Sequence, residues 1–577
     1  MQIQRYIIFS GEIFKFVKIL LICLLTFLSS VMIAKCENIA SIDLPSKPSY
    51  VESMFVEPQL SKQSNFDKLV KQIIYVNNQH PNAKDSNKGN QENLPLKTIE
   101  KATELALQNK SNNIGTKIII YPGIYRESIS VNGQDLKNDA PIIFAAKESG
   151  KTIISGADIW KDWQKLGNSN IYTLPWPYNW GFSGNPWTEW KVNLQPIVQR
   201  REMVFVDKKL LKQILSPSDI TPGTFSVSEQ DDLIYIYPPD DTNIKNNQIE
   251  VAIRPNLFIA KNLKNLVLRG LIFQHANSVL QEAVRIENTT NLLIENVEFI
   301  WNNWGGLHIS KTENVIIRNT KANYNGERGF SGDTSKNLLM ENTENSYNNW
   351  RGAWGDFYGW DSGQKFVYLN NMTIRKYKAV ENQAAGLWFD TGNKNILVEK
   401  AYICNNINYS LYIEANPGPI TIKNSVICNN RDINSKSLGE WYNPGILTAV
   451  SQNVILEGNV ICGNDRSQIR VIDQIDRDYT DVDTENKSKL KMENWLIKNN
   501  LIISNSNNNL IETPKWNHFF TTLNLEGNTW YNTQKSKVFK VDGRELDFNS
   551  WKSLMVNNQD KGFSTPSSIP NDCNYPT

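Results

Sequence analysis

The sequence has little net charge and few residues of the types that hold transition metals. It carries 61 Lys and Arg against 59 Asp and Glu, a formal net charge of +2, and only four His. Such a balance gives no reason to expect a nucleic acid or an anionic membrane as partner. No His and Cys residues stand at zinc-binding spacings. We therefore expect an uncharged or locally charged partner and no cofactor.

Cysteine is also scarce, with six residues in 577. Three of them, Cys404, Cys428 and Cys462, each follow an aliphatic pair or Tyr-Ile in matching contexts, so we expect them to stack in one column. Six scattered cysteines do not make the dense disulfide framework of a small secreted domain. We expect these three to act as small buried hydrophobic residues.

Long hydrophobic runs are rare, and the clearest one lies near the beginning. Arg5, Lys15 and Lys18 precede an apolar run over residues 19–34, which is the layout of a secretory signal. The run is short for a membrane span, although an uncleaved anchor stays an alternative. We expect residues 1–34 to be a signal peptide and the protein to be secreted, periplasmic or on the cell surface.

What the sequence has is an internal repeat from about residue 265 onward. An Asn followed by an alternation of aliphatic residues recurs at intervals that begin with 26, 23 and 23 residues. The alternation favours strands, and the interval suits one coil of a β-helix with two or three short strands. The recurring positions are Asn265, Asn291, Asn314, Asn337, Asn395 and Asn453.

A second segment follows each of these positions after about 15 residues and predicts the next strand of the same coil. It reads Gly306-Leu307-His308-Ile309 in one coil and Gly386-Leu387-Trp388-Phe389-Asp390 in another. Aligning these segments places four acids at equivalent positions, namely Asp333, Asp356, Asp390 and Glu414. Equivalent positions of successive coils lie about 4.8 Å apart, so the acids should form a column. Repulsion within such a column makes a purely structural role unattractive.

Residues 95–106 predict a capping helix, and the run from residue 117 predicts a strand that ends in Pro122-Gly123-Ile124-Tyr125. This N-terminal arrangement resembles the pectate-lyase-like superfamily of right-handed parallel β-helices. Between residues 156 and 255 the repeat stops, six Trp crowd the first part, and hairpin-like segments follow. We expect a small β domain inserted between early coils, with one or two of these Trp lining a cleft.

The predicted fold is therefore all-β: a right-handed parallel β-helix solenoid with an N-terminal capping helix and a small inserted β domain. The expected division is a signal peptide at 1–34, a linker at 35–72, a cap with the first coils at 73–155, the Trp-rich insert at 156–255, the main β-helix at 256–515 and a C-terminal cap at 516–577.

Asp390 and Glu414 are the best candidates for catalysis, because they stand 24 residues apart, one coil from each other on one face. Retaining glycosidases need two carboxyl groups about 5–5.5 Å apart, and adjacent coils supply that distance. An Asp followed one coil later by a Glu, with an inserted β domain, resembles β-helix glycoside hydrolases of the β-xylosidase type. The resemblance implies that Asp390 is the nucleophile and Glu414 the acid/base, acting on a polysaccharide or oligosaccharide.

Two alternatives remain open. A Ca²⁺-dependent polysaccharide lyase would hold the metal with Asp333, Asp356 and Asp390 and use Arg328 or Arg351 to remove a proton. A non-catalytic glycan-binding solenoid would need neither a metal ion nor a residue that removes a proton.

Aromatic residues and one histidine accompany the acids. Trp354 and Trp388 precede aligned acids by two residues and should point to the same side of their strands, either stacking on sugar or packing beneath a loop. His308 lies on that side too. It either shuttles a proton or bonds a sugar, or it is a histidine at the surface or beneath a loop. The Asn pairs 405–406 and 429–430 are expected to form a turn ladder between coils.

Overall fold

The computed structural model describes residues 66–134, 136, 138–190, 194–239, 244, 248–351, 363–431, 444–472, 474 and 476–560. The expected signal peptide and nearly all of the expected linker lie outside these residues. The chain divides into two compact units, and of the first unit, which comprises residues 1–55 and 184–193, only residues 184–190 are described, with the short 3-10 helix η4 (Thr188–Trp190). All that follows concerns the second unit.

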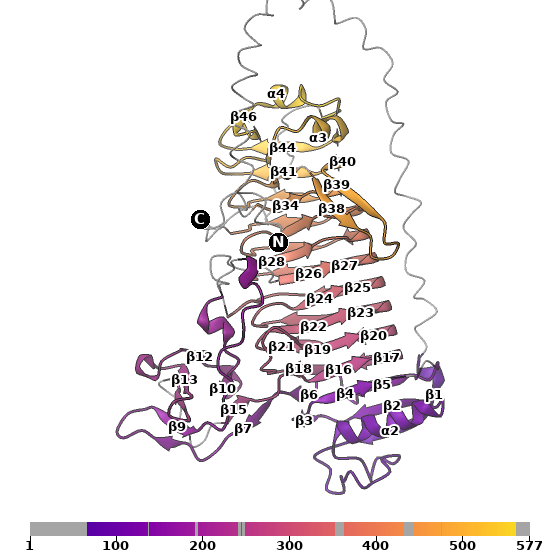
Figure 1. Cartoon of the computed structure of the whole chain (residues 1–577), viewed down its shortest axis with the longest axis vertical. Coiled ribbons are helices and arrows are strands. Elements are labelled where there is room, and N and C mark those ends of the chain that lie inside the picture. Colours follow the sequence, from indigo (N-terminus) through magenta and orange to yellow (C-terminus); the bar gives the residue numbers. More distant parts are fainter. Residues whose placement is uncertain are drawn as a thin grey trace, which may run out of the picture. The chain divides into compact units, whose positions relative to one another are not determined.

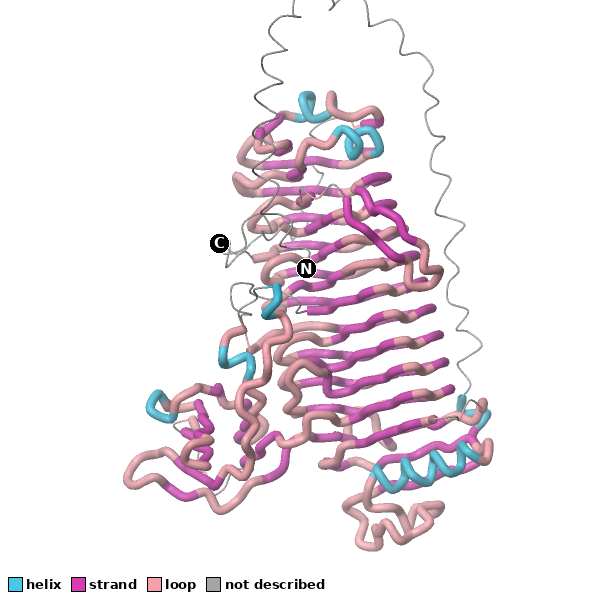
Figure 2. The backbone as a smooth tube through the Cα atoms, viewed as in Figure 1, coloured by secondary structure: helices cyan, strands magenta, loops and turns pink. Residues whose placement is uncertain are grey.

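The second unit is built mainly of parallel strands that stack coil upon coil in three columns (Figures 1 and 2). The prediction of a right-handed parallel β-helix is confirmed. The first column contains β1 (Val70–Val76), β2 (Gly115–Ile120), β5 (Ile142–Ala146), β17 (Lys264–Arg269), β20 (Thr290–Glu295), β23 (Glu313–Asn323), β25 (Lys336–Glu344), β27 (Asn370–Val380), β29 (Lys394–Glu399), β32 (Ile420–Lys423), β35 (Gln452–Glu457), β40 (Glu493–Lys498), β43 (Asn524–Glu526) and β47 (Asn557–Asn558).

The second column continues from the first, and the long strands β23, β25 and β27 run through both. Its other members are β3 (Gly123–Tyr125), β6 (Thr152–Ser155), β18 (Leu271–Gln274), β21 (Glu298–Ile300), β30 (Tyr402–Cys404), β33 (Val426–Cys428), β36 (Val460–Cys462), β41 (Leu501–Ser504) and β44 (Thr529–Asn532).

The third column is a separate sheet, and it bears the candidate acids. It contains β4 (Ile129–Asn132), β16 (Phe258–Lys261), β19 (Glu282–Glu287), β22 (Gly305–Ser310), β24 (Phe330–Asp333), β26 (Gly363–Val367), β28 (Ala385–Phe389), β31 (Leu411–Glu414), β34 (Ile446–Ala449), β37 (Ile469–Val471), β42 (Ile511–Thr513), β45 (Phe539–Val541) and the antiparallel end strand β46 (Arg544–Leu546).

The recurring Asn before each aliphatic alternation has a backbone role. These residues take left-handed conformations, with φ of 63° at Asn265 and 60° at Asn291, which Asn tolerates better than other residues that have a side chain. The amide of Asn291 donates to Oδ1 of Asn265 at 2.8 Å, and that of Asn314 donates to Asn291 at 3.2 Å. The Asn thus makes the turn and links it to the preceding coil.

Aliphatic side chains of each coil point inward and stack on their equivalents. Leu266 pairs in register with Leu292, and Leu292 with Val315, and all three are buried. A core of this kind extends along the coils from Ile74 to Met555.

Helices lie at the two ends of the coils. At the first coils, α2 (Ile99–Ser111) follows η3 (Phe66–Leu69) and β1, and it buries Ile99, Ala102 and Ala106. After the last coils lie α3 (Asn517–Thr522) and α4 (Phe548–Lys552). The coils begin at Val70, within the range expected for a linker, and β43, β44 and β45 continue the register beyond residue 515.

The inserted domain leaves the coils after β6 and returns before β16. A four-stranded sheet comprises β7 (Ala157–Ile159), β10 (Val204–Val206), β11 (Lys209–Leu210) and β15 (Ile249–Ala252), and a five-stranded sheet comprises β8 (Gln164–Lys165), β9 (Tyr172–Pro175), β12 (Lys212–Gln213), β13 (Thr224–Ser228) and β14 (Leu233–Tyr237), with short 3-10 helices η5 (Pro196–Gln199) and η6 (Pro217–Asp219). Trp176 is buried in the core of this domain, with Trp160, Trp163 and Trp180 packed against it.

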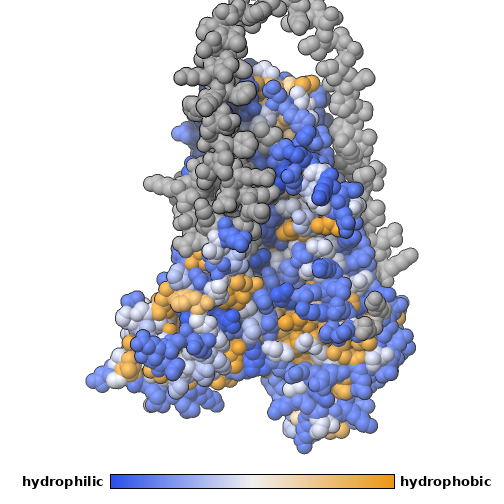
Figure 3. All heavy atoms as spheres, viewed as in Figure 1, coloured by the Kyte–Doolittle hydropathy of each residue, from blue (hydrophilic) through white to orange (hydrophobic). Residues whose placement is uncertain are grey.

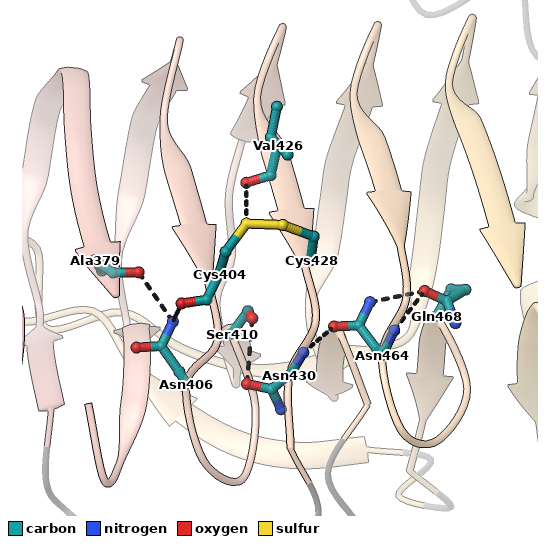
Figure 4. Close-up of a disulfide and its surroundings, with 9 residues drawn as sticks. All are labelled: Ala379, Cys404, Asn406, Ser410, Val426, Cys428, Asn430, Asn464 and Gln468. Atoms are coloured by element: carbon teal, nitrogen blue, oxygen red, sulfur yellow. Dashed lines mark hydrogen bonds between the residues drawn. A yellow bond between two sulfur atoms is a disulfide. The ribbon is translucent and has the colours of Figure 1, made fainter. Parts of the chain in front are cut away.

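The cysteine column forms as expected, because Cys404 pairs in register with Cys428 and Cys428 with Cys462. The expectation that these cysteines act only as small buried hydrophobic residues is wrong for two of them. Cys404 and Cys428 are joined by a disulfide (Figure 4). Parallel stacking brings the two Cα atoms to 4.5 Å, within the range that a disulfide can bridge.

The surface view in Figure 3 is largely hydrophilic, with hydrophobic side chains in patches over the inserted domain and over part of the coils. Among the described residues, no helix has the length and apolar character needed to cross a membrane.

Candidate active site

Asp390 and Glu414 occupy neighbouring register positions on the third column of strands. Phe389 pairs with Ile413. Asp390 directly follows β28, and Glu414 is the last residue of β31, so the acids are the next residues after this pair. Neighbouring strands lie about 4.8 Å apart, and residues at equivalent positions point to the same side. The sheet thus holds two carboxyl groups side by side.

Asp390 is held by a cation and by its own turn. Its Oδ2 lies 3.0 Å from Nζ of Lys365, while Oδ1 accepts hydrogen bonds from the Thr391 backbone N–H at 2.6 Å and from the Thr391 hydroxyl at 2.9 Å. Burial raises the pKa of Asp390, but Lys365 and Thr391 outweigh burial and hold that pKa below its ordinary value. Asp390 is therefore an ionised carboxylate in a fixed orientation.

The pKa of Glu414 is shifted in the opposite direction. Burial and the neighbouring charge of Asp390 raise the pKa of Glu414, and they outweigh the contribution of Arg477, whose Nη2 lies 3.0 Å from Oε1. Arg477 belongs to the hairpin of β38 (Asp476–Thr480) and β39 (Lys487–Lys491), and it also donates to Gln474 at 3.0 Å. The pKa of Asp390 is thus lowered and the pKa of the adjacent Glu414 is raised. General acid catalysis beside an ionised partner requires such a difference.

Aromatic rings pack beside the pair. Trp388 and Tyr412 stack with centroids 5.0 Å apart, and Lys365 Nζ lies 4.0 Å from the Trp388 ring centroid. Both aromatic side chains are almost fully buried. Trp388 therefore supports the positions of Lys365 and Tyr412 rather than presenting an open ring face.

Asp333 ends β24 and belongs to a network that was not expected. Its Oδ2 lies 3.1 Å from Nε2 of His308, and its Oδ1 accepts from the hydroxyl of Ser310 at 2.9 Å. His308 Nδ1 lies 2.8 Å from the Ser331 hydroxyl, which donates to buried Glu282 at 3.0 Å. Burial raises the pKa of Asp333, yet His308 and Ser310 keep it below the ordinary value.

The predicted four-acid column is wrong in one coil. Asp333 pairs in register with Val367 of β26, so a valine occupies the position that the sequence alignment gave to Asp356. Asp356 and Trp354 lie outside the described residues. The misalignment arose because residues 352–356 imitate the glycine-led segment of the other coils, whereas the strand itself is Gly363–Val367.

Arg328 and Arg351 have different surroundings, and neither lies at the Asp390–Glu414 pair. Arg328 Nε bonds Glu327 and lies 3.7 Å from Oε1 of Glu282. Arg351 reaches the inserted domain, where it donates to the Ile197 carbonyl at 3.0 Å, Gln213 at 2.9 Å and the Glu202 carbonyl at 2.8 Å. Arg351, one of the two cations considered for the lyase alternative, is therefore engaged with the inserted domain and has a structural role.

No group of three or more His, Cys, Asp or Glu residues within the described ranges could hold a metal ion. Asp333 and Asp390, two of the three residues expected to bind Ca²⁺ in a lyase, are separated by the coil that carries Val367. Each has its own basic partner, His308 for one and Lys365 for the other.

Sequence reasoning missed Lys365, Arg477 and Glu282. Lys365 was detectable, because Gly363-Gln364-Lys365-Phe366-Val367 has the same glycine-led pattern as the aligned segments. Glu282 begins β19, one coil before the first segment that was aligned. Arg477 gave no signal, because it comes from a hairpin outside the repeat.

A family model described as the right handed beta helix region matches residues 232–356 and 282–461. No curated protein matches the chain in sequence. Among solved structures, the complex of XylC with xylose is 15% identical, covering 82% of this chain and 86% of that one with a TM-score of 0.63. A second, described as a glycoside hydrolase, is 9% identical, covering 80% and 97% with a TM-score of 0.51. The chain is thus a right-handed parallel β-helix protein.

Proposed function

We propose that the protein is an exported carbohydrate-active enzyme, and specifically a retaining glycoside hydrolase with Asp390 as nucleophile and Glu414 as acid/base. The observation that carries the proposal is the asymmetry of the pair. One carboxyl group is held ionised by Lys365, and its neighbour is biased toward the protonated form by burial and by the first charge. Export rests on the layout of residues 1–34.

The first step breaks the glycosidic bond. The Asp390 carboxylate attacks the anomeric carbon while Glu414 gives its proton to the departing oxygen, which leaves as an alcohol. The loss of that proton leaves Glu414 as a carboxylate beside Arg477, which stabilises the new charge. In the second step Glu414 takes a proton from water, and the water oxygen displaces Asp390 from the glycosyl ester.

The carbohydrate class is supported by the structural neighbours, one titled as a complex with xylose and one as a glycoside hydrolase. Both likenesses are in fold, so the sugar must be found by experiment. We propose an oligosaccharide or polysaccharide substrate, and a xyloside is a reasoned first choice.

The test begins with p-nitrophenyl glycosides, including β-linked ones that carry one, two or three xylose units. Proton NMR of the first product formed should show the same anomeric configuration as the substrate. A matching 2-deoxy-2-fluoro glycoside should inactivate the enzyme and label the peptide that contains Asp390. EDTA should leave the rate unchanged.

Asp390→Asn and Glu414→Gln should each lower kcat by about 10³-fold or more, a loss of the size seen when a member of a catalytic unit is removed. Glu298→Gln, a carboxylate on β21 of the second column, is the matched control and should retain the rate. Inversion of configuration, or a label on a different peptide, would refute the retaining assignment. An unsaturated product would instead indicate a lyase.

A further inference from the structure

The Asp333 network lies two strands from the proposed nucleophile on the same sheet. Register pairing runs from Asp333 to Val367, and Val367 stands one strand from Asp390. Two strand spacings amount to about 10 Å, a distance that a neighbouring sugar unit of a bound oligosaccharide can span. The side chain of Val367 between them is half-buried.

Ser331 and Asp333 lie on either side of the histidine in this network. The Ser331 hydroxyl donates to the Glu282 carboxylate at 3.0 Å. His308 Nδ1 lies 2.8 Å from the Ser331 oxygen, and Nε2 lies 3.1 Å from the Asp333 carboxylate, which can only accept, so Nε2 is the donor. His308 thus gives Asp333 a fixed N–H partner.

The surroundings of Ser331 do not suit a Ser-His-Asp hydrolase at this place. Such a triad needs a serine whose proton can pass to the histidine. The proton of Ser331 is engaged with Glu282, and the Ser331 side chain is buried, with 4% of the residue exposed. Ser331 therefore positions His308 and does not act as a nucleophile.

Asp333 is the member of the network with an open side. Its side chain is 34% exposed, compared with 20% for Asp390 and 13% for Glu414. His308, Ser310 and Thr334 bond this carboxylate, which has about four acceptor positions. A fixed carboxylate with spare acceptor capacity is well suited to bind sugar hydroxyl groups, since its orientation is set before the ligand arrives.

The positions of the acid and of Asp333 indicate which part of a substrate would meet Asp333. The leaving oxygen lies near the acid, on the side opposite to the nucleophile. Glu414 lies one coil after Asp390 and Asp333 lies two coils before it, so Asp333 is remote from the departing group, and we assign it to the retained part of the substrate.

We propose that Asp333, positioned by His308, accepts hydroxyl hydrogen bonds from a sugar unit on the retained side of the substrate, so that the site favours chains over single glycosides. This inference rests on the proposed function. It makes Asp333 a binding residue and His308 a positioning residue.

The test compares kcat/KM for aryl glycosides of one, two and three sugar units. In the wild type the longer glycosides should be preferred. Asp333→Asn should reduce the preference for the longer glycosides over the shortest by about 10- to 100-fold, as expected for a hydrogen bond to a charged group, and mainly through KM. Glu298→Gln, whose side chain is similarly exposed at 37%, should keep the wild-type preference.

His308→Ala should reduce the preference as Asp333→Asn does, and His308→Gln, whose side-chain amide keeps N–H donors, should restore part of it. Equal losses on all substrate lengths, with unchanged preference, would overturn the inference. So would an unchanged preference with unchanged rates.

A binding arm separates this inference from the proposed chemistry. Calorimetric titration of Glu414→Gln protein with xylo-oligosaccharides of two to four units, with and without Asp333→Asn, measures binding without turnover. If the wild type cleaves no glycoside but Asp333→Asn still weakens oligosaccharide binding about 10-fold or more, the hydrolase fails and the binding position stands. If cleavage occurs but Asp333→Asn leaves binding unchanged, the hydrolase stands and the proposed binding position fails.

Discussion

At the scale of single residues, two carboxyl groups of similar chemistry become different because their neighbours differ. Lys365 approaches one oxygen of Asp390 at 3.0 Å, while Glu414 experiences the charge of Asp390 in a buried position. The proposed mechanism needs Asp390 ionised and Glu414 protonated. Activity should thus fall at low pH as Asp390 gains a proton and at high pH as Glu414 loses one, giving a bell-shaped profile.

Lys365→Met tests the origin of the acid limb. Lys365 lowers the pKa of Asp390, so its removal should raise that pKa and move the acid limb of the kcat/KM profile to higher pH, with a lower maximum. Lys365→Arg, which keeps the charge, should leave the limb near its wild-type position. Lys261→Met, which removes an exposed ion pair with Glu287, is the control. An acid limb that stays in place without Lys365 would contradict this account of Asp390.

Of the candidate site, the sequence yielded the pair of acids and missed the cations beside it. Asp390 and Glu414 were found because they sit in the repeat. Arg477 comes from a hairpin 63 residues beyond Glu414, so only the folded coils bring it near. Asp356 was misplaced because a glycine-led segment was aligned in place of the true strand.

At the scale of secondary structure, a ladder of buried asparagines joins successive coils at the turn after the second column. Asn302, Asn325, Asn348, Asn382 and Asn406 follow one another, and each bonds the next. The expected ladder at Asn405–Asn406 and Asn429–Asn430 is confirmed for its buried members, since the Asn406 side chain donates to the Ala379 carbonyl and the Asn430 backbone N–H donates to Oδ1 of Asn464 (Figure 4).

Asn348→Ala should lower the free energy of unfolding by about 2–4 kcal/mol, because it leaves at least two buried polar groups without partners. Asn348 accepts from the Asn325 backbone at 2.9 Å and donates to the Ala322 carbonyl at 2.9 Å. Asn486→Ala, at an exposed position whose φ is not positive, should cost less than about 0.5 kcal/mol. Urea unfolding followed by circular dichroism measures both, and equal effects would show that burial of the ladder is unimportant.

Strands were more predictable than their connections. The alternation of aliphatic residues fixes which face is inward, and the left-handed Asn marks where each strand begins. Where the chain adds residues to a coil, as before β26, no periodicity remains to guide alignment, and the prediction failed there.

At the scale of the whole molecule, the inserted domain is connected to the coils by more than its two chain crossings. Arg351 donates to three acceptors in the insert, and Asn303 donates to the Arg200 carbonyl. Burial lowers the pKa of Arg351 to about 10, so the side chain stays charged at neutral pH.

Arg351→Ala should leave three acceptors in the insert without this donor and loosen its attachment. We expect limited proteolysis to cut within residues 157–252 several times faster than in the wild type, while the coils remain resistant. Arg431→Ala, which removes an exposed ion pair with Glu381, is the control. Equal cutting rates in all three proteins would show that Arg351 does not hold the insert.

The disulfide between Cys404 and Cys428 has a mechanical consequence. If the molecule is pulled from its ends, tension crosses from one coil to the next through the sulfur atoms, and the intervening loop carries no load. With a sequence separation of 24, the bond withholds roughly 80 Å of extensible chain. That shielded loop contains Glu414, so the segment with the proposed acid would be the part of this coil that stretching alone cannot draw out.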